Sequence, residues 1–444
     1  MTSSPARPAI DWPAIQAEAL DHFVRYLRIP SVNPPGNEAP AARFLGGVIE
    51  AAGVPCEYIE TQPNREVVVA RLRGDGSKGT LMLCNHSDVV PVEEQFWDVP
   101  AFEGLVRDGF VYGRGAVDMK GAGIMQLTAF LLLARHRVPL ARDLVFCAVP
   151  DEEAGGRWGM QWLCEQRPDL VDVEYELNEG GMGMDRVMGR PARLITVAVT
   201  EKKICGLRLR AVGKPGHGSV PHFDNSLVHL SRAIARLADW ERAPRLTPVV
   251  AEYLRRLADA GLVEAPDGDL ERALPGLAAS HPRQAAMYIN TLNATTFHSG
   301  IKINVIPALS EATLDCRLLP DQDPEEWRQQ VIARIDDPRI EVEFAQFRGD
   351  TVANDWNTEL FRVIQQVVSE AMEDAIVTPV MTVGGTDNRF LRERGVPAYG
   401  FIPALLSPEE LAGFHGNNEK LSLENFNLGC ELTYEVVRRF CASG

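Results

Sequence analysis

The chain has 444 residues, of which 45% are hydrophobic and 24% are charged, and its formal net charge at pH 7 is −16. These values are typical of a globular protein with two domains, or with one large domain that carries an insertion. The acidic balance argues against nucleic acid or an anionic membrane as a partner, because both need clustered lysine and arginine. The expected partner is therefore a small molecule.

The N-terminal sequence MTSSPARPAIDWP lacks the apolar segment of a secretory signal, and no apolar run of membrane-spanning length follows it. The eight cysteines lie far apart and include no C-x-x-C pair. This usage is typical of reduced thiols inside a protein core. We therefore expect a cytoplasmic protein with no membrane partner.

Helices and strands alternate through the first part of the chain. Apolar residues at helical spacing predict helices at 13–28, 39–52, 122–134 and 158–164. Short apolar runs predict strands at 67–72, 80–84, 143–149 and 171–177. Alternation of this kind is typical of an α/β domain in which helices flank a sheet.

Polar clusters follow three of these strands. The motifs NHSDVVP, PDEEAGG and NEGG come directly after the strands at 80–84, 143–149 and 171–177, and GRGAVDMKG precedes the helix at 122–134. Open α/β sheets bind ligands at the carboxyl ends of their strands, so these clusters are expected to meet. With the later motif FHGNNEK they supply seven candidate side chains, which are His86, Asp88, Asp118, Glu152, Glu153, Glu179 and His415.

Imidazoles and carboxylates without thiolates are ligands for zinc, manganese or cobalt, and a set of this size suits two adjacent ions. Asp118 is the candidate bridge, because its glycine-rich turn permits close approach and the following helix dipole supports its charge. Asp88 is expected to orient the imidazole of His86.

The adjacent glutamates Glu152 and Glu153 suit two different tasks. One can bind metal while the other acts as general base for water, which is the chemistry of amide hydrolysis. A glutamate pair taken alone is more often a solvated acidic turn. Only the other clusters of the chain favour the metal site.

The second part of the chain changes its pattern. Strands are predicted within 196–212 and at 300–306, 311–318 and 340–344, with helices at 226–237 and 324–335 and a further helical excursion before 300. The order βαββαβ is that of an α+β module. We therefore expect one domain made of 1–198 and 348–444, into which a domain spanning 199–347 is inserted. A helix at 358–371, a strand at 376–382, the loop GGTDNRF and a helix at 423–439 complete the first domain.

The motifs RIPSVNP, NHSDVVP, GRGAVDMKG, PDEE, NEGG, GHGSVP, NVIP, GGTDNRF and FHGNNE follow one another along nearly the whole chain. Each is weak alone, but in this order they resemble the M20 family of dinuclear zinc amidohydrolases and exopeptidases. That family includes acetylornithine deacetylase, succinyl-diaminopimelate desuccinylase, aminoacylase, carnosinase and glutamate carboxypeptidase. The resemblance implies a zinc-exopeptidase-like catalytic domain with a mixed sheet flanked by helices, and an inserted lid and dimerisation domain.

The resemblance also implies a role for each candidate. His86, Asp118 and Glu179 would hold one divalent ion, and Asp118, Glu153 and His415 the other, with zinc expected first and cobalt or manganese as alternatives. Glu152 matches the general base and Asp88 the acid that orients the histidine. The peptide bond between Asp118 and Met119 is expected to be cis. Asn85 stands where many members have glycine.

In the inserted module, His217 of GHGSVP matches a histidine that reaches the active site of the partner subunit in dimeric members and polarises the scissile carbonyl. Judged from the glycine-rich turn alone, it would be a surface histidine. His222 lacks such a match and stays unassigned. Asn304 of NVIP resembles a residue of the lid that touches substrate. The expected assembly is a homodimer formed through this module.

Arg317 of DCRLLP could bind a substrate carboxylate through its two parallel donors, or form a salt bridge within the lid. Gly384 and Gly385 of the GGTDNRF loop could present backbone N–H groups to the same carboxylate, because glycine permits close approach. Arg389 suits a structural and a functional role equally.

The predicted activity is metal-dependent hydrolysis of the amide bond in N-acyl amino acids. Glu179, where other members have aspartate, resembles the deacylase-like members and favours this substrate. The alternative is a dipeptidase or carboxypeptidase that uses the same site on peptides with a free amine. A non-catalytic scaffold is disfavoured because every ligand and the base are present, and a single-domain M28-type aminopeptidase is disfavoured because it would lack the inserted module.

Overall fold

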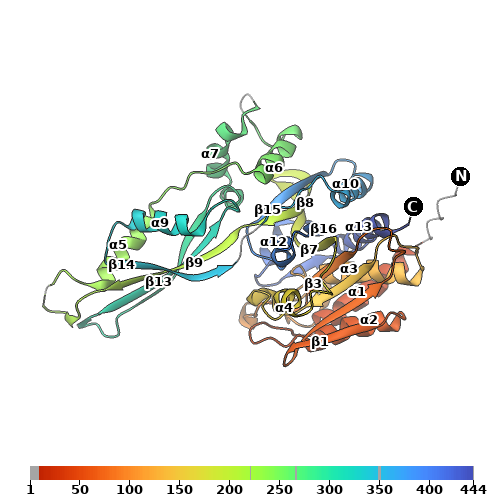
Figure 1. The fold of residues 1–444 in the computed structure, drawn as a ribbon, viewed down its shortest axis with the longest axis horizontal. Helices are drawn as coiled ribbons and strands as arrows, with labels where there is room; N and C mark the ends of the chain where they lie inside the picture. Colours follow the sequence, from red (N-terminus) through yellow and green to blue (C-terminus); the bar gives the residue numbers. More distant parts are fainter. Residues whose placement is uncertain (1–9, 221, 266–267, 349–351, 444) are drawn as a thin grey trace.

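A mixed sheet of eight strands organises the larger part of the molecule (Figure 1). The computed structural model describes residues 10–220, 222–265, 268–348 and 352–443. The strands lie in the order β1 (Cys56–Gln62), β2 (Arg65–Leu72), β6 (Leu144–Val149), β3 (Leu81–His86), β7 (Tyr175–Val187), β16 (Ala398–Leu406), β8 (Arg190–Glu201) and β15 (Ile376–Thr382). β3 is parallel to both β6 and β7, so β3 and β6 end at one edge, and β7 continues past this edge to Val187.

Helices cover both faces of this sheet, which confirms the predicted α/β class. One face packs against α1 (Trp12–Leu27), α2 (Ala39–Ala51), α3 (Lys120–Arg135), α10 (Glu359–Ala371) and α13 (Leu423–Cys441). The other face packs against α4 (Met160–Gln166) and α11 (Asn388–Arg392). Every residue of β3 and β6 is buried, which is why β6 and the first four residues of β3 are continuous apolar runs rather than alternating ones.

An elongated arm extends from this part of the molecule (Figure 1). Its antiparallel sheet has the order β11 (Thr291–Ser299), β13 (Leu309–Leu318), β9 (Lys203–Val212) and β14 (Ile340–Arg348). The helices α5 (Ser226–Ala238) and α9 (Pro324–Ile335) bury one face of it, with Leu230 and Trp327 in a core of their own. The predicted βαββαβ order is therefore present in the arm.

One strand of the arm lies elsewhere than predicted. The sequence places it at 300–306, whereas β11 ends at Ser299 and Gly300 turns the chain with a φ of 68°. Only the two-residue strand β12 (Val305–Ile306) forms in that stretch, and it pairs with β10 (Gly216–His217). The error arises because most residues of β11 are exposed and polar, so hydrophobicity gives no signal there.

The helical excursion between α5 and β11 packs on the larger part of the molecule. It consists of α6 (Pro248–Asp259), α7 (Leu270–Ser280) and α8 (Pro282–Ala285). Val250, Tyr253 and Leu257 of α6 share a buried cluster with Val377 of β15. The division of the chain into 1–198 with 348–444 and an inserted 199–347 stays a prediction.

Shorter elements complete the fold. They are η1 (Glu94–Phe96), β4 (Leu105–Arg107), β5 (Phe110–Tyr112), η2 (Glu152–Ala154), α12 (Pro408–Gly413) and β17 (Lys420–Ser422). Across the part of the chain that the structure describes, no helix combines the length and apolar character needed to cross a membrane.

Candidate metal centre

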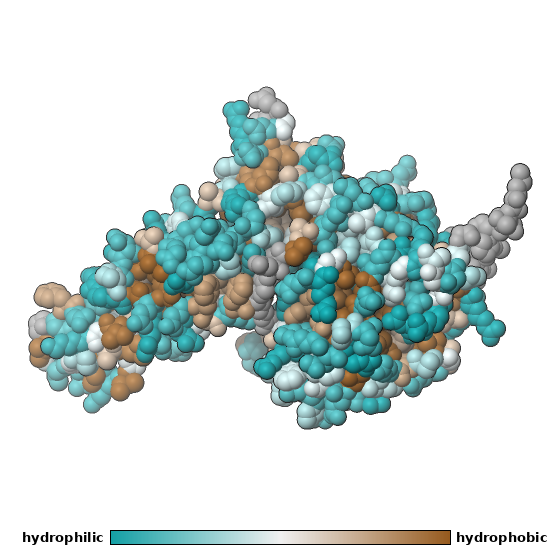
Figure 2. All heavy atoms as spheres, in the orientation of Figure 1, coloured by the Kyte–Doolittle hydropathy of each residue, from teal (hydrophilic) through white to brown (hydrophobic). Residues whose placement is uncertain are grey.

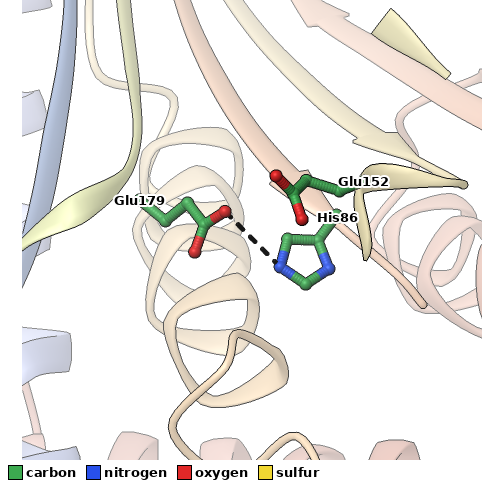
Figure 3. A group of neighbouring side chains, drawn as sticks. All are labelled: His86, Glu152 and Glu179. Carbon is green, nitrogen blue, oxygen red and sulfur yellow. Dashed lines mark ion pairs between the residues drawn. The ribbon is translucent and has the colours of Figure 1, made fainter. Parts of the chain in front are cut away.

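The predicted ligands come together at the edge where β6 and β3 end and where β7 extends beyond its pairing with β3. His86 is the last residue of β3, and Glu152 and Glu153 open the short helix η2 that follows β6. The sequence places Glu179 in a loop, but β7 continues through NEGG to Val187, so Glu179 lies within a strand. Its side chain, that of His86 and that of Glu152 point toward a common space (Figure 3).

Asp118 lies between two imidazoles. Nε2 of His86 is 3.0 Å from Oδ1 of Asp118, and Nε2 of His415 is 2.8 Å from Oδ2. His86 Nε2 also lies 3.6 Å from Glu179 Oε1, and His415 Nε2 lies 3.2 Å from Glu153 Oε2. The geometry thus forms two groups that share Asp118, as the resemblance implies.

Donor atoms lie close enough together for metal binding. Potential ligand atoms of His86, Glu152 and Glu179 lie within 4.8 Å of one another, and so do those of His86, Asp118 and Glu153. Glu152 is therefore near the same space as the ligands, as a base acting on a shared water must be. The peptide bond between Asp118 and Met119 is cis, which confirms that prediction.

Asp88 supports the site from behind. Its carboxylate accepts the backbone N–H groups of Glu152 and Glu153 at 3.2 and 3.1 Å. Nδ1 of His86 lies 3.0 Å from the backbone carbonyl oxygen of Asp88 and 3.5 Å from its carboxylate. This one buried residue therefore orients both the imidazole and the turn that carries the glutamates.

Burial and mutual repulsion make the glutamates of this site reluctant to ionise, whereas hydrogen bonds from His415 and His86 lower the pKa of Asp118. Burial raises the pKa of Glu152 well above its ordinary value, and the Glu179 carboxylate raises it further. Burial and the Asp118 carboxylate raise the pKa of Glu179 to about 7. Hydrogen bonds to Asp118 and Glu153 raise the pKa of His415 to about 10.

This donor set fits divalent cations. Oε1 of Glu153 is buried and has no hydrogen-bond partner among the described residues. Orphaned carboxylate oxygen and concentrated negative charge are costly inside a protein unless cations balance them. Nitrogen and oxygen donors without sulfur are those that zinc, manganese and cobalt accept.

A cavity of about 630 Å³ opens onto the site. Arg317, Gly384 and Gly385 line it together with Asp118, Glu152, Glu153, Glu179 and His415. Apolar side chains form much of the remaining wall, namely Met182, Ile204, Ile402 and Phe414. The guanidinium of Arg317 pairs with Asp315, which does not line the cavity, at 2.7 Å from Nε to Oδ1 and 3.1 Å from Nη2 to Oδ2.

Two predicted residues lie outside this cavity. His217 and Asn304 are exposed residues of the arm, and the backbone carbonyl oxygen of Asn304 accepts the N–H of Gly218 beside His217. Nδ1 of His217 lies 2.7 Å from Oγ of Ser219. Neither side chain reaches the candidate metal ligands within this one chain.

Arg389 is buried, and its guanidinium donates to the backbone oxygens of Thr386 and Gly155. It thereby ties the GGTDNRF loop to the residues that follow Glu153. This arrangement favours the structural role over direct contact with substrate.

Sequence reasoning missed Glu419, the fully buried acid of the FHGNNEK motif. Its carboxylate accepts the backbone N–H groups of Gly115, Val117 and Asp118 and pairs with Arg114 at 2.8 Å. The available signal was its position four residues after His415 in a motif already singled out.

Known proteins resemble the chain in sequence and in fold. A sequence profile of peptidase family M20/M25/M40 matches residues 82–439. The mouse protein N-fatty-acyl-amino acid synthase/hydrolase PM20D1 is 31% identical over 382 residues, which cover 82% of this chain and 75% of that protein. Human aminoacylase-1 is 28% identical over 427 residues, which cover 92% of each chain.

Among solved structures, the M20 family metallo-carboxypeptidase Sso-CP2 from Sulfolobus solfataricus shares the fold. Its TM-score is 0.73 at 20% sequence identity, and the match covers 95% of this chain and 98% of that one. The chain therefore belongs to peptidase family M20/M25/M40 and is a hydrolase of amide or peptide bonds that uses divalent metal ions.

Proposed function

We propose that this hydrolase cleaves the amide bond of N-acyl amino acids at a centre of two zinc ions, with Glu152 as general base. The observation that carries the proposal is the position of Asp118 between two imidazoles, with 3.0 Å from Oδ1 to His86 and 2.8 Å from Oδ2 to His415. A carboxylate that offers one oxygen to each side suits a bridge between two ions. Zinc is preferred over cobalt or manganese because such donor sets are typical of zinc hydrolases.

Each ion has a proposed set of protein ligands. His86, Asp118 and Glu179 would hold one, and Asp118, Glu153 and His415 would hold the other. When bound, the ions supply Lewis acidity and lower the pKa of water. Every other part of the reaction falls to side chains of this chain.

The Glu152 carboxylate accepts the proton of the attacking water and then delivers it to the leaving amide nitrogen. Asp88 holds the backbone N–H groups of Glu152 and Glu153, so it fixes where that carboxylate can reach.

The cavity lining supports an acylated substrate over a peptide with a free amine. Every carboxylate that lines the cavity among the described residues belongs to the proposed metal centre, namely Asp118, Glu152, Glu153 and Glu179. A protonated amine would lack a carboxylate of its own, whereas an acyl chain would meet Met182, Ile204, Ile402 and Phe414. The similarity to aminoacylase-1 and to an N-fatty-acyl-amino acid hydrolase agrees with this preference.

Arg317 is proposed to bind the α-carboxylate of the substrate. It lines the cavity beside Gly384 and Gly385, and its two parallel donors already engage the carboxylate of Asp315. A substrate carboxylate offers the same geometry and would exchange with Asp315. The glycines would add backbone N–H groups to the same anion.

The arm is proposed to form a homodimer, in which His217 and Asn304 act at the site of the partner subunit. Phe223, Ile301 and Ile303 are between 97% and 102% exposed, and hydrophobic side chains gather over the outer end of the arm (Figure 2). Apolar side chains so exposed favour an interface. A cytoplasmic location is also proposed, because all eight cysteines are free thiols and seven of them are buried.

The substrate class is tested with a matched pair of compounds. N-propionyl-L-leucine and L-alanyl-L-leucine release the same leucine and differ only in the free amine. The zinc-loaded enzyme should hydrolyse the propionyl compound at least about tenfold faster in kcat/KM, because the amine must be desolvated without a partner. Faster hydrolysis of alanyl-leucine would favour the dipeptidase alternative over the deacylase.

A further inference from the structure

We infer that Arg65 is a positioning residue for the reaction. Together with Asn33 it fixes Asp88 and the turn that begins at Asp151 and carries Glu152. Arg65 lies at the start of β2, far from these residues in the sequence. The inference rests on the proposed function, because Glu152 and the metal ligands are what Arg65 would hold in place.

The guanidinium of Arg65 is buried among acidic side chains. Nη1 pairs with Oδ1 of Asp151 and lies 3.3 Å from Oε1 of Glu38. Arg65 is 7% exposed, Asp151 3% and Glu38 0%. Among the described residues, no other cation lies within ion-pair distance of either acid. Removing one partner of a buried pair leaves an uncompensated charge, so Arg65 is required wherever these acids are ionised.

The chain makes room for this guanidinium at one glycine. Gly36 has a φ of 91°, and a Cβ atom built there would lie 2.0 Å from Nη2 of Arg65. Nη2 instead donates to the backbone oxygen of Pro35 at 2.7 Å and to Oδ1 of Asn33 at 3.0 Å. The guanidinium is thus held at a defined orientation by contacts from three sides.

Asn33 connects Arg65 with the candidate metal centre through hydrogen bonds. While its Oδ1 accepts from Arg65, its Nδ2 donates to Oδ2 of Asp88 at 2.8 Å and to Oδ1 of Asp151 at 3.2 Å. Asp88 in turn accepts the N–H groups of Glu152 and Glu153. Three hydrogen bonds therefore connect Arg65 with the backbone of the proposed base.

The second route runs through Asp151 itself. This residue directly precedes Glu152 and has a φ of 75°, which a non-glycine residue adopts only where its surroundings hold it. Its carboxylate is fixed on one side by Arg65 and on the other by the N–H of Trp158 at 2.9 Å. Loss of Arg65 would release one of the three contacts to this carboxylate, the others being those of Asn33 and Trp158.

The charge balance of this cluster makes Arg65 difficult to replace. Asp88, Asp151 and Glu38 are buried together behind the site. Arg65 pairs with Asp151 and Glu38, while His86 lies 3.5 Å from Asp88. Burial, with a further contribution from Asp88, raises the pKa of Glu38 to about 8, while Arg65 opposes the shift. Glu38 can therefore bind a proton, which leaves the guanidinium for Asp151 and Asn33.

The inference is tested with Arg65→Met, Arg65→Lys and Asn33→Ala. The readouts are kcat and KM for N-propionyl-L-leucine, zinc retained per chain after dialysis against a chelator, and the unfolding temperature. Arg65→Met should lower kcat about 100-fold with KM changed less than about threefold, because a shift of about 1 Å in the base costs that much. Its zinc retention should also fall below that of the wild type.

The kcat of Arg65→Lys should be at least about tenfold higher than that of Arg65→Met. Lysine keeps the positive charge, although it lacks the parallel N–H donors of the guanidinium group. Asn33→Ala removes the route to Asp88 but keeps the ion pairs, so kcat should fall about tenfold at an unfolding temperature near that of the wild type. The variant Asn33→Ala therefore tests the inference even if Arg65→Met does not fold. Arg43→Met is the matched control, because Arg43 pairs with Glu66, the next residue of β2, on the surface.

A kcat of Arg65→Met within about twofold of the wild type would overturn the inference. The inference would also be overturned if Arg65→Met and Arg65→Lys both fold and lose the same amount of kcat. A kcat equal to that of the wild type in Asn33→Ala would overturn it as well. If the wild-type enzyme hydrolyses no amide substrate, the proposed function fails. Zinc retention of the folded Arg65 variants still tests the positioning role, and retention equal to that of the wild type would then overturn it.

Discussion

The backbone N–H of Asp118 donates to Oε1 of Glu419 at 3.0 Å. The same oxygen accepts the N–H of Val117 at 2.7 Å, and Oε2 accepts the N–H of Gly115 at 2.9 Å. Glu419 lies four residues after His415 in the sequence. One buried carboxylate therefore joins the loop of the proposed bridging ligand to the loop of His415.

Glu419→Gln should loosen both loops. The glutamine amide group can still accept hydrogen bonds through one oxygen, but its nitrogen cannot accept from Gly115 or from Arg114. Each buried donor left without a partner costs about 1–3 kcal/mol, so the unfolding temperature should fall by several degrees. Zinc per chain after dialysis should also fall.

The control is Glu424→Gln, at an exposed position in the first turn of α13. It should behave as the wild type. If Glu419→Gln kept both its zinc and its unfolding temperature, Glu419 would have no role in holding the loops together.

Glu152→Ala should retain metal and lose turnover. Its neighbour Glu153 keeps its contact with His415, at 3.2 Å in the wild type, whereas the attacking water loses its base. General bases contribute about 10²–10⁴-fold, so kcat should fall by at least about 10²-fold at unchanged zinc content. Glu153→Ala is the matched variant and should lose zinc instead. Near-normal turnover in Glu152→Ala would assign the base elsewhere.

His217→Ala should lower kcat with little change in zinc content, because His217 lies outside the cavity of its own chain. If it acts at the partner's site, mixing His217→Ala with Glu152→Ala subunits creates one site with both residues intact. Part of the activity should return in the mixture. A purified heterodimer with no recovered activity would contradict action across the interface.

Stability of the protein stripped of metal should fall as pH rises from 5 to 9. Burial raises the pKa of Glu176 to about 7 and that of Asp387 to about 8. Unfolded acids titrate near pH 4, so between about pH 4 and 8 these two acids bind more protons in the folded chain than in the unfolded chain. Under that condition the free energy of unfolding decreases as pH increases.

Glu176→Gln isolates this effect, because its side chain stays neutral at every pH. Its unfolding temperature should match that of the wild type near pH 5 and exceed it at pH 8.5, by an amount that corresponds to roughly 2 kcal/mol. Thermal unfolding at several pH values measures the difference. A wild-type protein that becomes more stable toward pH 9, with Glu176→Gln in parallel, would contradict the sign.

Sequence patterns predicted the sheet and the site for the same physical reason. β6 and the first four residues of β3 are continuous apolar runs, so the polar residues that come directly after these runs stand out. Parallel pairing then brings His86 and Glu152 together without further information. The assignment of each ligand to an ion depended on the order of the motifs rather than on any local pattern.

The strand β16 was not predicted. Its sequence, AYGFIPALL, contains glycine and proline, which usually argue against a central strand. The glycines of the NEGG motif also argued against a strand, although they lie within β7. A Cβ atom at Gly181 would lie 2.3 Å from the backbone oxygen of Gly400, so this glycine permits the close approach of β7 and β16 rather than a turn.

Residues such as Arg65 and Glu419 could not be found from periodicity. Each forms contacts with residues far away in the sequence. A single charged residue in a polar segment is normally expected to be exposed to solvent. Only the fold reveals that they are buried and paired.

The most direct test of the account is a metal titration of the stripped protein. Zinc bound per chain and hydrolysis of N-propionyl-L-leucine are measured together as zinc is added. Two equivalents should bind in the wild type, hydrolysis should rise with them, and Glu152→Ala should bind the same two equivalents without hydrolysis. Hydrolysis that persists in the stripped protein, or saturation of the wild type at a single equivalent, would contradict the dinuclear centre.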